Sequence, residues 1–334
     1  MLQIEKELIT QSQTTVKAAI AAVESETASI AEKIEMLLAI ATDLQQKPKS
    51  SQQLAEAIAL YDKAYELAQE NYPLFKGRAL AGKGTALRTI PNESAELLLL
   101  AKQAYESALP ILQEFAAPEE VAEVEMNLGL VLQALVPFHQ GRMEDAIQAY
   151  QRSLRTFTGA THPQEYAILQ NNIAIAYLSL ALAPEKEAMR DSLAVQSLTE
   201  ALQWINLIDH PNEYAMLQNN LANTLQYLSS THPLENNLKA LAAYDEALKV
   251  RTLQDTPLEY ASTIANKANL LYNLPDDLEH PEAGNRQNLL QAKTYYQEAG
   301  DIFFQYGDLG RRETVAAALV EVEKELSAWG DSNE

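Results

Sequence analysis

Asparagines recur at matching places in similar phrases of this chain, and their amides are its most regular chemical feature. The clearest phrases begin at Pro163 and Pro211, and the matching amides are those of Asn171, Asn172, Asn219, Asn220, Asn127 and Asn266. A primary amide carries both a donor and an acceptor, so such a row could hold the backbone of a bound peptide whatever its side chains. The same amides could instead bond to a neighbouring helix and fix how the repeats stack. The sequence leaves both interpretations open.

Further polar and aromatic residues follow these amides at helical spacing in the C-terminal copies. Asn223 lies one turn beyond Asn219, and Asn269 lies three residues beyond Asn266, which places each on the same helix face as its predecessor. The set is completed by Gln226, Tyr227, Tyr272 and Asn273. We therefore expect the best binding groove in the C-terminal copies, with hydrogen bonds from the amides and apolar contact from the two tyrosines.

A group of cations stands out in an otherwise acidic chain. It consists of Lys76, Arg78, Lys83 and Arg88. Arg78 and Arg88 fall at places that align with the groove, where a guanidinium could hold a carboxylate by paired hydrogen bonds. The alternative is that these cations pair with the protein's own carboxylates.

Catalytic and metal-binding patterns are missing from the sequence. Four of the five histidines immediately precede proline, where an extended turn leads into a helix, and these are His162, His210, His232 and His280. There is no cysteine, no phosphate-binding glycine loop, no nucleophile elbow and no paired histidine–glutamate helix motif. We expect no catalytic residue, no metal and no cofactor, and therefore not an enzyme.

The charge of the chain restricts its partners. Lysine and arginine total 25 against 46 acidic residues, for a formal net charge of -21 over 334 residues. Such a surface repels nucleic-acid phosphates and anionic lipid, so we expect a protein or peptide partner, neutral or basic. No signal sequence and no long apolar stretch is seen, so we expect a cytoplasmic protein without membrane insertion. The sequence does not indicate an oligomeric state.

The phrases that carry the asparagines also read as helix starts. Each opens with a proline, at Pro73, Pro118, Pro163, Pro211 and Pro257, and four of the five have a glutamate two residues later. Proline at the first helical position loses only a backbone N–H that has no partner in any case, and the glutamate complements the helix N-terminus. We call the helix that begins at each phrase helix A. An equivalent first helix is expected over residues 29–45.

A second helix, helix B, follows each helix A. Its register is a small residue, an aromatic or leucine, and another small residue at spacings of 4 and 3. The copies are Ala57/Tyr61/Ala64, Ala101/Tyr105/Ala108, Ala146/Tyr150/Ser153, Ala194/Leu198/Ala201, Ala240/Tyr244/Ala247 and Ala292/Tyr296/Ala299. They begin 44 to 52 residues apart, a period typical of stacked repeats. The small residues allow a close helix crossing, and the aromatic fills the gap between helices.

The boundaries follow from these repeats. We expect an N-terminal capping helix within residues 1–27, a solenoid over 28–300 and a C-terminal capping helix with a short tail over 301–334. Loops are expected at 181–191, 229–236 and 273–288. No domain boundary is placed inside the array.

The phrases resemble a known family. The sequence His-Pro-x-Glu-Tyr-Ala-x-Leu-Gln-Asn-Asn-Φ-Ala at 162–174 and 210–222, followed by Ala-x3-Tyr-x2-Ala, resembles tetratricopeptide repeats. The similarity is to the long-repeat type of kinesin light chains and of bacterial arrays, including cyanobacterial ones. It implies an all-α, right-handed α-solenoid of about six antiparallel helix pairs, whose helices A line a concave groove that binds peptides or partner helices.

The chain also departs from the family. Glycine at the small position of helix A survives only as Gly84 and Gly129, and Lys83 and Lys267 replace the apolar residue beside it. No protease or kinase domain follows the array, so we expect any effector to be another molecule.

The expected function is that of a non-catalytic scaffold or adaptor. The alternative is an assembly factor or chaperone that shields a basic subunit of a larger complex with its acidic surface. A sensor for a small ligand is a third possibility, for which the sequence shows no pocket signature.

Overall fold

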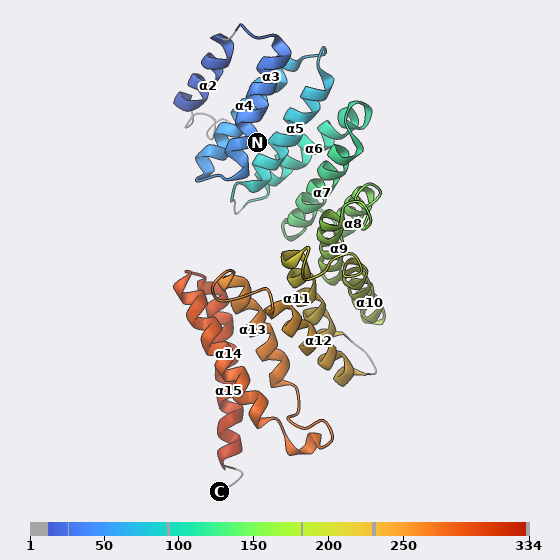
Figure 1. The fold of residues 1–334 in the computed structure, drawn as a ribbon, viewed down its shortest axis with the longest axis vertical. Helices are drawn as coiled ribbons and strands as arrows, with labels where there is room; N and C mark the ends of the chain where they lie inside the picture. Colours follow the sequence, from blue (N-terminus) through green and yellow to red (C-terminus); the bar gives the residue numbers. More distant parts are fainter. Residues whose placement is uncertain (1–12, 26, 92–93, 182, 229–231, 332–334) are drawn as a thin grey trace. The chain divides into compact units, whose positions relative to one another are not determined.

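The computed structural model describes residues 13–331 except for residues 26, 92–93, 182 and 229–231. Within these residues the chain is all-α and has no β-strand (Figure 1). The helices group into two compact units, Met1–Thr158 and Gly159–Glu334. From the sequence, no domain boundary is expected between Thr158 and Gly159. Each repeat of such an array packs only on its neighbours, so no single core has to span the whole chain.

Unit 1 contains three antiparallel helix pairs behind one leading helix. Its helices are α2 (Gln13–Ser25), α3 (Ile30–Gln46), α4 (Ser51–Ala68), α5 (Pro73–Thr89), α6 (Glu96–Phe115), α7 (Pro118–Leu135) and α8 (Met143–Ser153), with a 3-10 turn η1 (Val136–Phe138) after α7. The pairs are α3/α4, α5/α6 and α7/α8, and α2 packs on α3 and α4. Helix α2 lies within the range 1–27 in which an N-terminal capping helix is expected, and residues 1–12 of that range lie outside the described residues.

Unit 2 contains three further pairs and ends in a long helix. Its helices are α9 (Pro163–Leu178), α10 (Pro184–Ala201), α11 (Pro211–Tyr227), α12 (Pro233–Leu248), α13 (Pro257–Tyr272), α14 (Arg286–Gln305) and α15 (Leu309–Asp331), with a 3-10 turn η2 (Pro281–Ala283). The pairs are α9/α10, α11/α12 and α13/α14, and α15 packs on α14 and α13. The six pairs confirm the predicted solenoid of stacked helix pairs. The last pair extends to Gln305, beyond the expected limit at residue 300.

The helix starts follow the prolines. Each phrase-opening proline is the first residue of its helix A, from α5 to α13. Helix α3 has no proline and begins with a capping box instead: Ser29 and Glu32 satisfy each other's backbone N–H groups. His162, His210 and His232 are N-cap residues ahead of prolines, as expected.

Two predicted loops are shorter than expected. Helix α10 begins at Pro184, inside the loop expected over 181–191, and α12 begins at Pro233, inside the loop expected over 229–236. In both helices proline takes the first helical position and acidic residues occupy the first turn, which favours helix over loop. The third loop, 273–288, is largely confirmed, since only η2 and the start of α14 interrupt it.

Helices A form the inner layer of each unit. In unit 1, α3 contacts α5 and α5 contacts α7; in unit 2, α9 contacts α11 and α11 contacts α13. Among the residues described, no comparable contact joins the helices B of neighbouring pairs. The layer whose members lie closer together is the inner side of a curve, so helices A line the concave side within each unit.

The tyrosines of helices B pack against the small positions of helices A. Tyr61, Tyr105, Tyr150, Tyr244 and Tyr296 are all buried. A Cβ added at Gly84 or Gly129 would lie 2.8 Å and 2.4 Å from the Tyr105 and Tyr150 rings. One at Gly82 would lie 2.4 Å from the Tyr61 ring. Glycine therefore persists at these positions because the tyrosine ring takes the space of its missing side chain.

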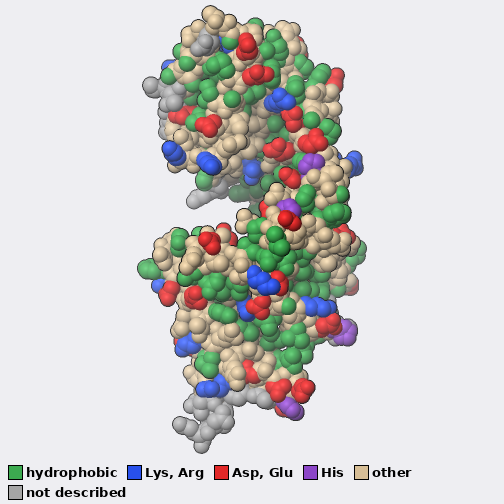
Figure 2. Space-filling view, viewed as in Figure 1, with side chains coloured by type: hydrophobic (Ala, Val, Ile, Leu, Met, Phe, Trp, Pro, Cys, Tyr) green, Lys and Arg blue, Asp and Glu red, His purple; other side chains and the backbone are tan. Residues whose placement is uncertain are grey.

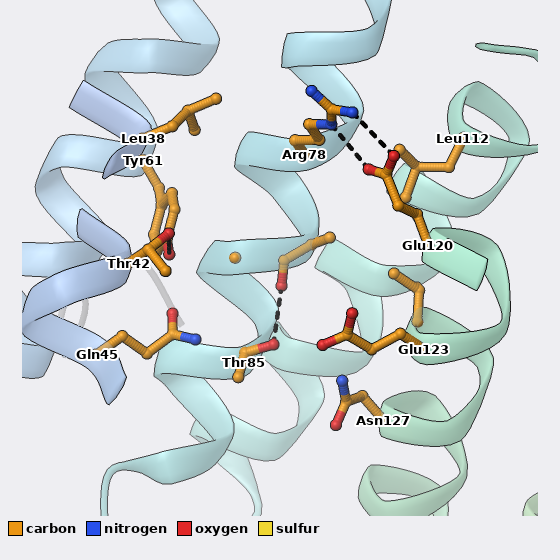
Figure 3. A pocket seen from close by; sticks show the side chains of 13 residues that line it. Leu38, Thr42, Gln45, Tyr61, Arg78, Thr85, Leu112, Glu120, Glu123 and Asn127 are labelled. Atoms are coloured by element: carbon orange, nitrogen blue, oxygen red, sulfur yellow. Dashed lines mark hydrogen bonds and ion pairs between the residues drawn. The ribbon is translucent and has the colours of Figure 1, made fainter. Parts of the chain in front are cut away.

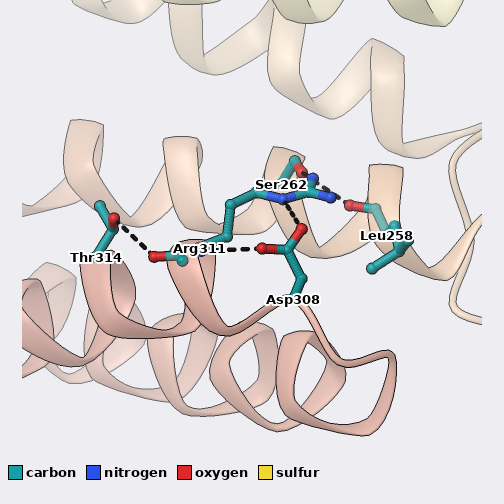
Figure 4. Close-up of polar contacts among 6 residues, drawn as sticks. Leu258, Ser262, Asp308, Arg311 and Thr314 are labelled. Atoms are coloured by element: carbon teal, nitrogen blue, oxygen red, sulfur yellow. Dashed lines mark hydrogen bonds and ion pairs between the residues drawn. The ribbon is translucent and has the colours of Figure 1, made fainter. Parts of the chain in front are cut away.

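Helix α15 is fastened to α13 by polar contacts near its start (Figure 4). The Asp308 carboxylate accepts hydrogen bonds from the backbone N–H and the Nε of Arg311, at 3.0 and 2.6 Å. Arg311 Nη1 donates to Ser262 Oγ on α13 at 2.7 Å. The two hydrogen bonds that Asp308 accepts from Arg311 hold the Asp308 pKa below its usual range.

One segment, Pro118–Phe138, is long and apolar enough to cross a membrane by length and composition alone. Half of its most apolar window is buried, and α7 packs on α5, α6 and α8. A core helix of a helical array has the same properties, so this observation gives little support to membrane insertion.

Substituting Gly129 tests the tyrosine packing. Gly129→Ala places a methyl group against the Tyr150 ring and should lower the free energy of unfolding by about 1–3 kcal/mol, measured by urea unfolding. Gly310→Ala is the matched control, since nothing lies within 4 Å of a Cβ there. Equal stability of the two variants would contradict the packing role.

The same tyrosines make stability depend on alkaline pH. Burial raises the pKa of Tyr61, Tyr105, Tyr150, Tyr244 and Tyr296. Above about pH 10 the unfolded chain loses phenolic protons that the folded chain keeps, so the free energy of unfolding is full below that pH and falls as pH rises further. The share of the tyrosinate absorbance that belongs to these five among the 15 tyrosines should therefore appear only together with loss of far-UV helicity. Ionisation of all 15 at unchanged helicity would contradict this.

Candidate functional site

The predicted asparagines of unit 2 divide into two groups, and the first links two helices. Asn220 Nδ2 donates to Asn171 Oδ1 at 2.6 Å, from α11 to α9. Asn219 Nδ2 donates to Asn220 Oδ1 at 3.0 Å. Asn171 and Asn219 are buried. The Asn220–Asn171 bond therefore crosses a repeat interface, as the stacking interpretation requires, while Asn219 Oδ1 is buried without a donor.

The second group is half-buried and open. Asn172, Asn223 and Asn266 make no hydrogen bond with any of the residues described. Nearby, Asn269 Nδ2 donates to the hydroxyl of Tyr227 at 2.6 Å, joining α13 to α11. Tyr227 is 64% exposed. An amide–tyrosine surface is thus present on α11 and α13 of unit 2.

The other predicted members of that surface serve the fold in part. Gln226 Oε1 accepts from the buried Tyr244 hydroxyl at 3.2 Å. Asn273 donates to the backbone carbonyl of Asn269, and the Tyr272 carbonyl accepts from Asn285. Tyr272 is half-buried and Asn273 is exposed.

The free energy of unfolding should distinguish the role of Asn220 from that of Asn223. Asn220→Ala leaves the buried Asn171 amide oxygen without its donor and should lower the free energy of unfolding by about 1–3 kcal/mol. Asn223→Ala breaks no such bond and should change it by no more than about 0.5 kcal/mol. Urea unfolding of the two variants gives the comparison, and equal losses would contradict the division.

The cations of unit 1 are mostly paired with carboxylates. Lys76 Nζ lies 2.9 Å from Glu70, and Lys83 Nζ lies 2.9 Å from Asp62. Lys267 pairs in the same way with Asp245 in unit 2. Lys83 and Lys267, which each replace an apolar residue on helix A, thus pair with a carboxylate on the preceding helix B.

Arg78 is held by a two-pronged ion pair. Its Nε and Nη2 each lie 2.8 Å from a carboxylate oxygen of Glu120 on α7 (Figure 3). This contact raises the Arg78 pKa and lowers that of Glu120. The guanidinium face expected to hold a ligand carboxylate is therefore occupied by the protein itself.

Arg88 differs from these cations. Its Nη2 donates to Asn127 Oδ1 at a long 3.5 Å, and its Nε is buried without an acceptor. Among the residues described it makes no ion pair with a carboxylate. It joins α5 to α7 through Asn127, which places that asparagine at a repeat contact as well as at the concave face.

A hollow lies on the concave face of unit 1. Its volume is about 290 Å³, and its lining comes mainly from α3, α5 and α7 (Figure 3). Between α3 and α7, helix α5 contributes the small residues Ala81, Gly82 and Thr85. Leu38, Tyr61, Leu112 and Val124 supply apolar wall. The small residues of α5 keep this part of the face open.

Two amides face this hollow from opposite sides. Gln45 comes from α3, and its Oε1 is buried with no donor. Asn127 comes from α7 and is itself buried. Its Nδ2 has no acceptor among the residues described. An unsatisfied acceptor and an unsatisfied donor thus lie across α5, the arrangement that a peptide backbone can satisfy.

A second hollow adjoins the first along α3 and α5. It measures about 590 Å³ and shares Leu38, Thr42 and Arg78 with the first. Its other lining residues are Glu35, Ala39, Asp43, Gln46 and Phe75. Together the two form one surface, which we call the unit 1 hollow.

No protein-family model and no curated protein matches this sequence. Among solved structures, a signal transduction ATPase with numerous domains and a tetratricopeptide repeat sensor, from Pyrococcus horikoshii, aligns with 93% of this chain at 16% identity and a TM-score of 0.59. The alignment covers 43% of that protein, so this chain spans less than half of its length. The chain has a tetratricopeptide-repeat fold.

Two other tetratricopeptide-repeat alignments are looser. The TPR2AB domain of yeast Sti1, solved as a complex with pHSP90, matches 88% of this chain and 99% of its own length at 16% identity, with a TM-score of 0.31. A Rap protein complexed with competence and sporulation factor matches 96% of this chain and 99% of its own length at 12% identity, with a TM-score of 0.44.

Several residues of the unit 1 hollow escaped the sequence analysis of this tetratricopeptide-repeat chain. Thr42 and Gln45 lie in α3, the one helix A that lacks the proline phrase, so no alignment placed them in the groove. Thr85 donates to the Ala81 carbonyl at 3.2 Å and lies 2.9 Å from the Tyr105 hydroxyl. The small residues Ala81 and Gly82 were the signal that could have marked this part of the face as open.

Metal-binding groups are the next feature of the described part of the chain. No group of three or more histidine, aspartate or glutamate side chains there is placed to hold a metal ion. On the face drawn in Figure 2, Asp and Glu side chains occur over both units.

Proposed function

We propose that this chain is a non-catalytic interaction scaffold whose unit 1 hollow holds an extended segment of a partner protein. The observation that carries the proposal is the buried Gln45 Oε1 on α3, which has no donor and lies across the small residues of α5 from the Asn127 amide on α7. A buried acceptor without a donor is costly, so a ligand that supplies a backbone N–H gains from satisfying Gln45, and its C=O can accept from Asn127 Nδ2.

The shape of the hollow supports a peptide rather than a compact small molecule. Its two parts run along α3 and α5 as adjoining spaces of about 290 and 590 Å³. Apolar residues such as Leu38 and Phe75 alternate with polar ones along this lining. An extended segment can place its backbone between the amides and its side chains against the apolar wall.

The amide–tyrosine surface of unit 2 is a second contact region within this proposal. Asn172, Asn223 and Asn266 keep free donors and acceptors toward solvent, and Tyr227 is exposed beside them. Asn171 and Asn220 do not belong to it, since their amides bond to each other between α9 and α11, and Asn219 is buried beside them.

An assembly factor or chaperone that shields a basic subunit remains the alternative. The net charge of -21 favours it, and the carboxylates seen over both units on the face drawn in Figure 2 fit contact over a broad surface. Such charge-driven binding should weaken steeply between low and moderate ionic strength, whereas binding that depends on backbone hydrogen bonds should not.

Truncating Gln45 tests the proposed site. A peptide selected on the full chain from a random-sequence library should bind Gln45→Ala about three- to tenfold more weakly, because one hydrogen bond to its backbone is lost. Affinity is measured by fluorescence anisotropy. Gln113→Ala, on the exposed side of α6, is the matched control. Peptides that bind Gln45→Ala and wild type equally well would place the site elsewhere.

A further inference from the structure

We infer that the segment bound in the unit 1 hollow carries a lysine or arginine side chain, which rests on the function proposed above. The charged groups that line the hollow are four carboxylates, Glu35, Asp43, Glu120 and Glu123, and a single cation, Arg78. A ligand cation would improve this balance, and a ligand carboxylate would worsen it.

The one cation of the lining is already neutralised. Arg78 donates twice to Glu120, at 2.8 Å in each case. The Glu35 charge raises the Arg78 pKa further, so Glu35 also lies within electrostatic reach of the guanidinium. Arg78 therefore offers little attraction to an acidic ligand, and the carboxylates of the lining exceed its charge.

The apolar part of the lining fits the stem of a long basic side chain. Leu38, Ala39 and Phe75 lie in the same hollow as Glu35 and Asp43. Lysine and arginine bury an aliphatic stem on apolar surface while their charged end stays near water and carboxylates. A short polar or an acidic side chain would use only one half of this surface.

Three labelled peptides of equal length, alternating Ala–Lys, Ala–Gln and Ala–Glu, provide the test with the full chain. We expect the order of affinity to be Lys above Gln above Glu in fluorescence anisotropy. The double variant Glu35→Gln/Asp43→Asn should weaken the Ala–Lys peptide by about tenfold and leave the Ala–Gln peptide unchanged. Both carboxylates are exposed, so far-UV helicity should not change.

A matched variant controls for net charge. Glu66→Gln/Glu114→Gln removes the same charge from exposed places on helices B, α4 and α6, and should leave the affinity for Ala–Lys close to wild type. Equal weakening by both double variants would show attraction to the whole acidic surface and overturn the inference.

The remaining outcomes separate the inference from the proposed function. If all three peptides bind equally and all lose affinity in Gln45→Ala, the hollow binds backbone and the inference alone fails. If none of the three binds, both the inference and the proposed function fail.

Discussion

A buried tyrosine packed where a helix has no room for a larger side chain is the contact on which the repeats depend. The rings of Tyr105 and Tyr150 lie against Gly84 and Gly129 of the paired helix A, and Tyr61 lies against Gly82 of the next pair. Such packing sets how closely helices A and B approach. In unit 1, where these contacts position the helices, they also set which residues of helix A reach the concave face.

A buried tyrosine hydroxyl needs a hydrogen-bond partner, and polar residues of helix A supply it. The hydroxyl of Tyr150 donates to Gln133, that of Tyr244 to Gln226, and that of Tyr105 lies beside Thr85. Asn171 and Asn220 likewise bond to each other between α9 and α11. Polar groups at groove positions are thus shared between the fold and any ligand, and only those left without a partner can recognise one.

In unit 1 two such groups face the same hollow. Gln45 and Asn127 approach the same hollow from α3 and α7, with the paired Arg78 and Glu120 beside them. The lining of the unit 1 hollow is acidic, like the chain as a whole, since it has more carboxylates than cations. The two observations act on different parts of a ligand: the amides address its backbone, and the carboxylates and apolar wall address one side chain.

The sequence by itself determined the helices, because proline phrases and the small–aromatic–small register depend on local backbone and packing rules that act within a few turns. Tertiary structure decided which polar residues are free. The asparagines of both phrases look alike in sequence, yet Asn220 bonds across a repeat interface while Asn223, one turn away, does not. Gln45 could not be found from the phrase, since α3 lacks it. A hydrogen bond between helices depends on positions some 40 to 50 residues apart, as with Asn171 and Asn220, and a one-dimensional pattern does not contain that geometry.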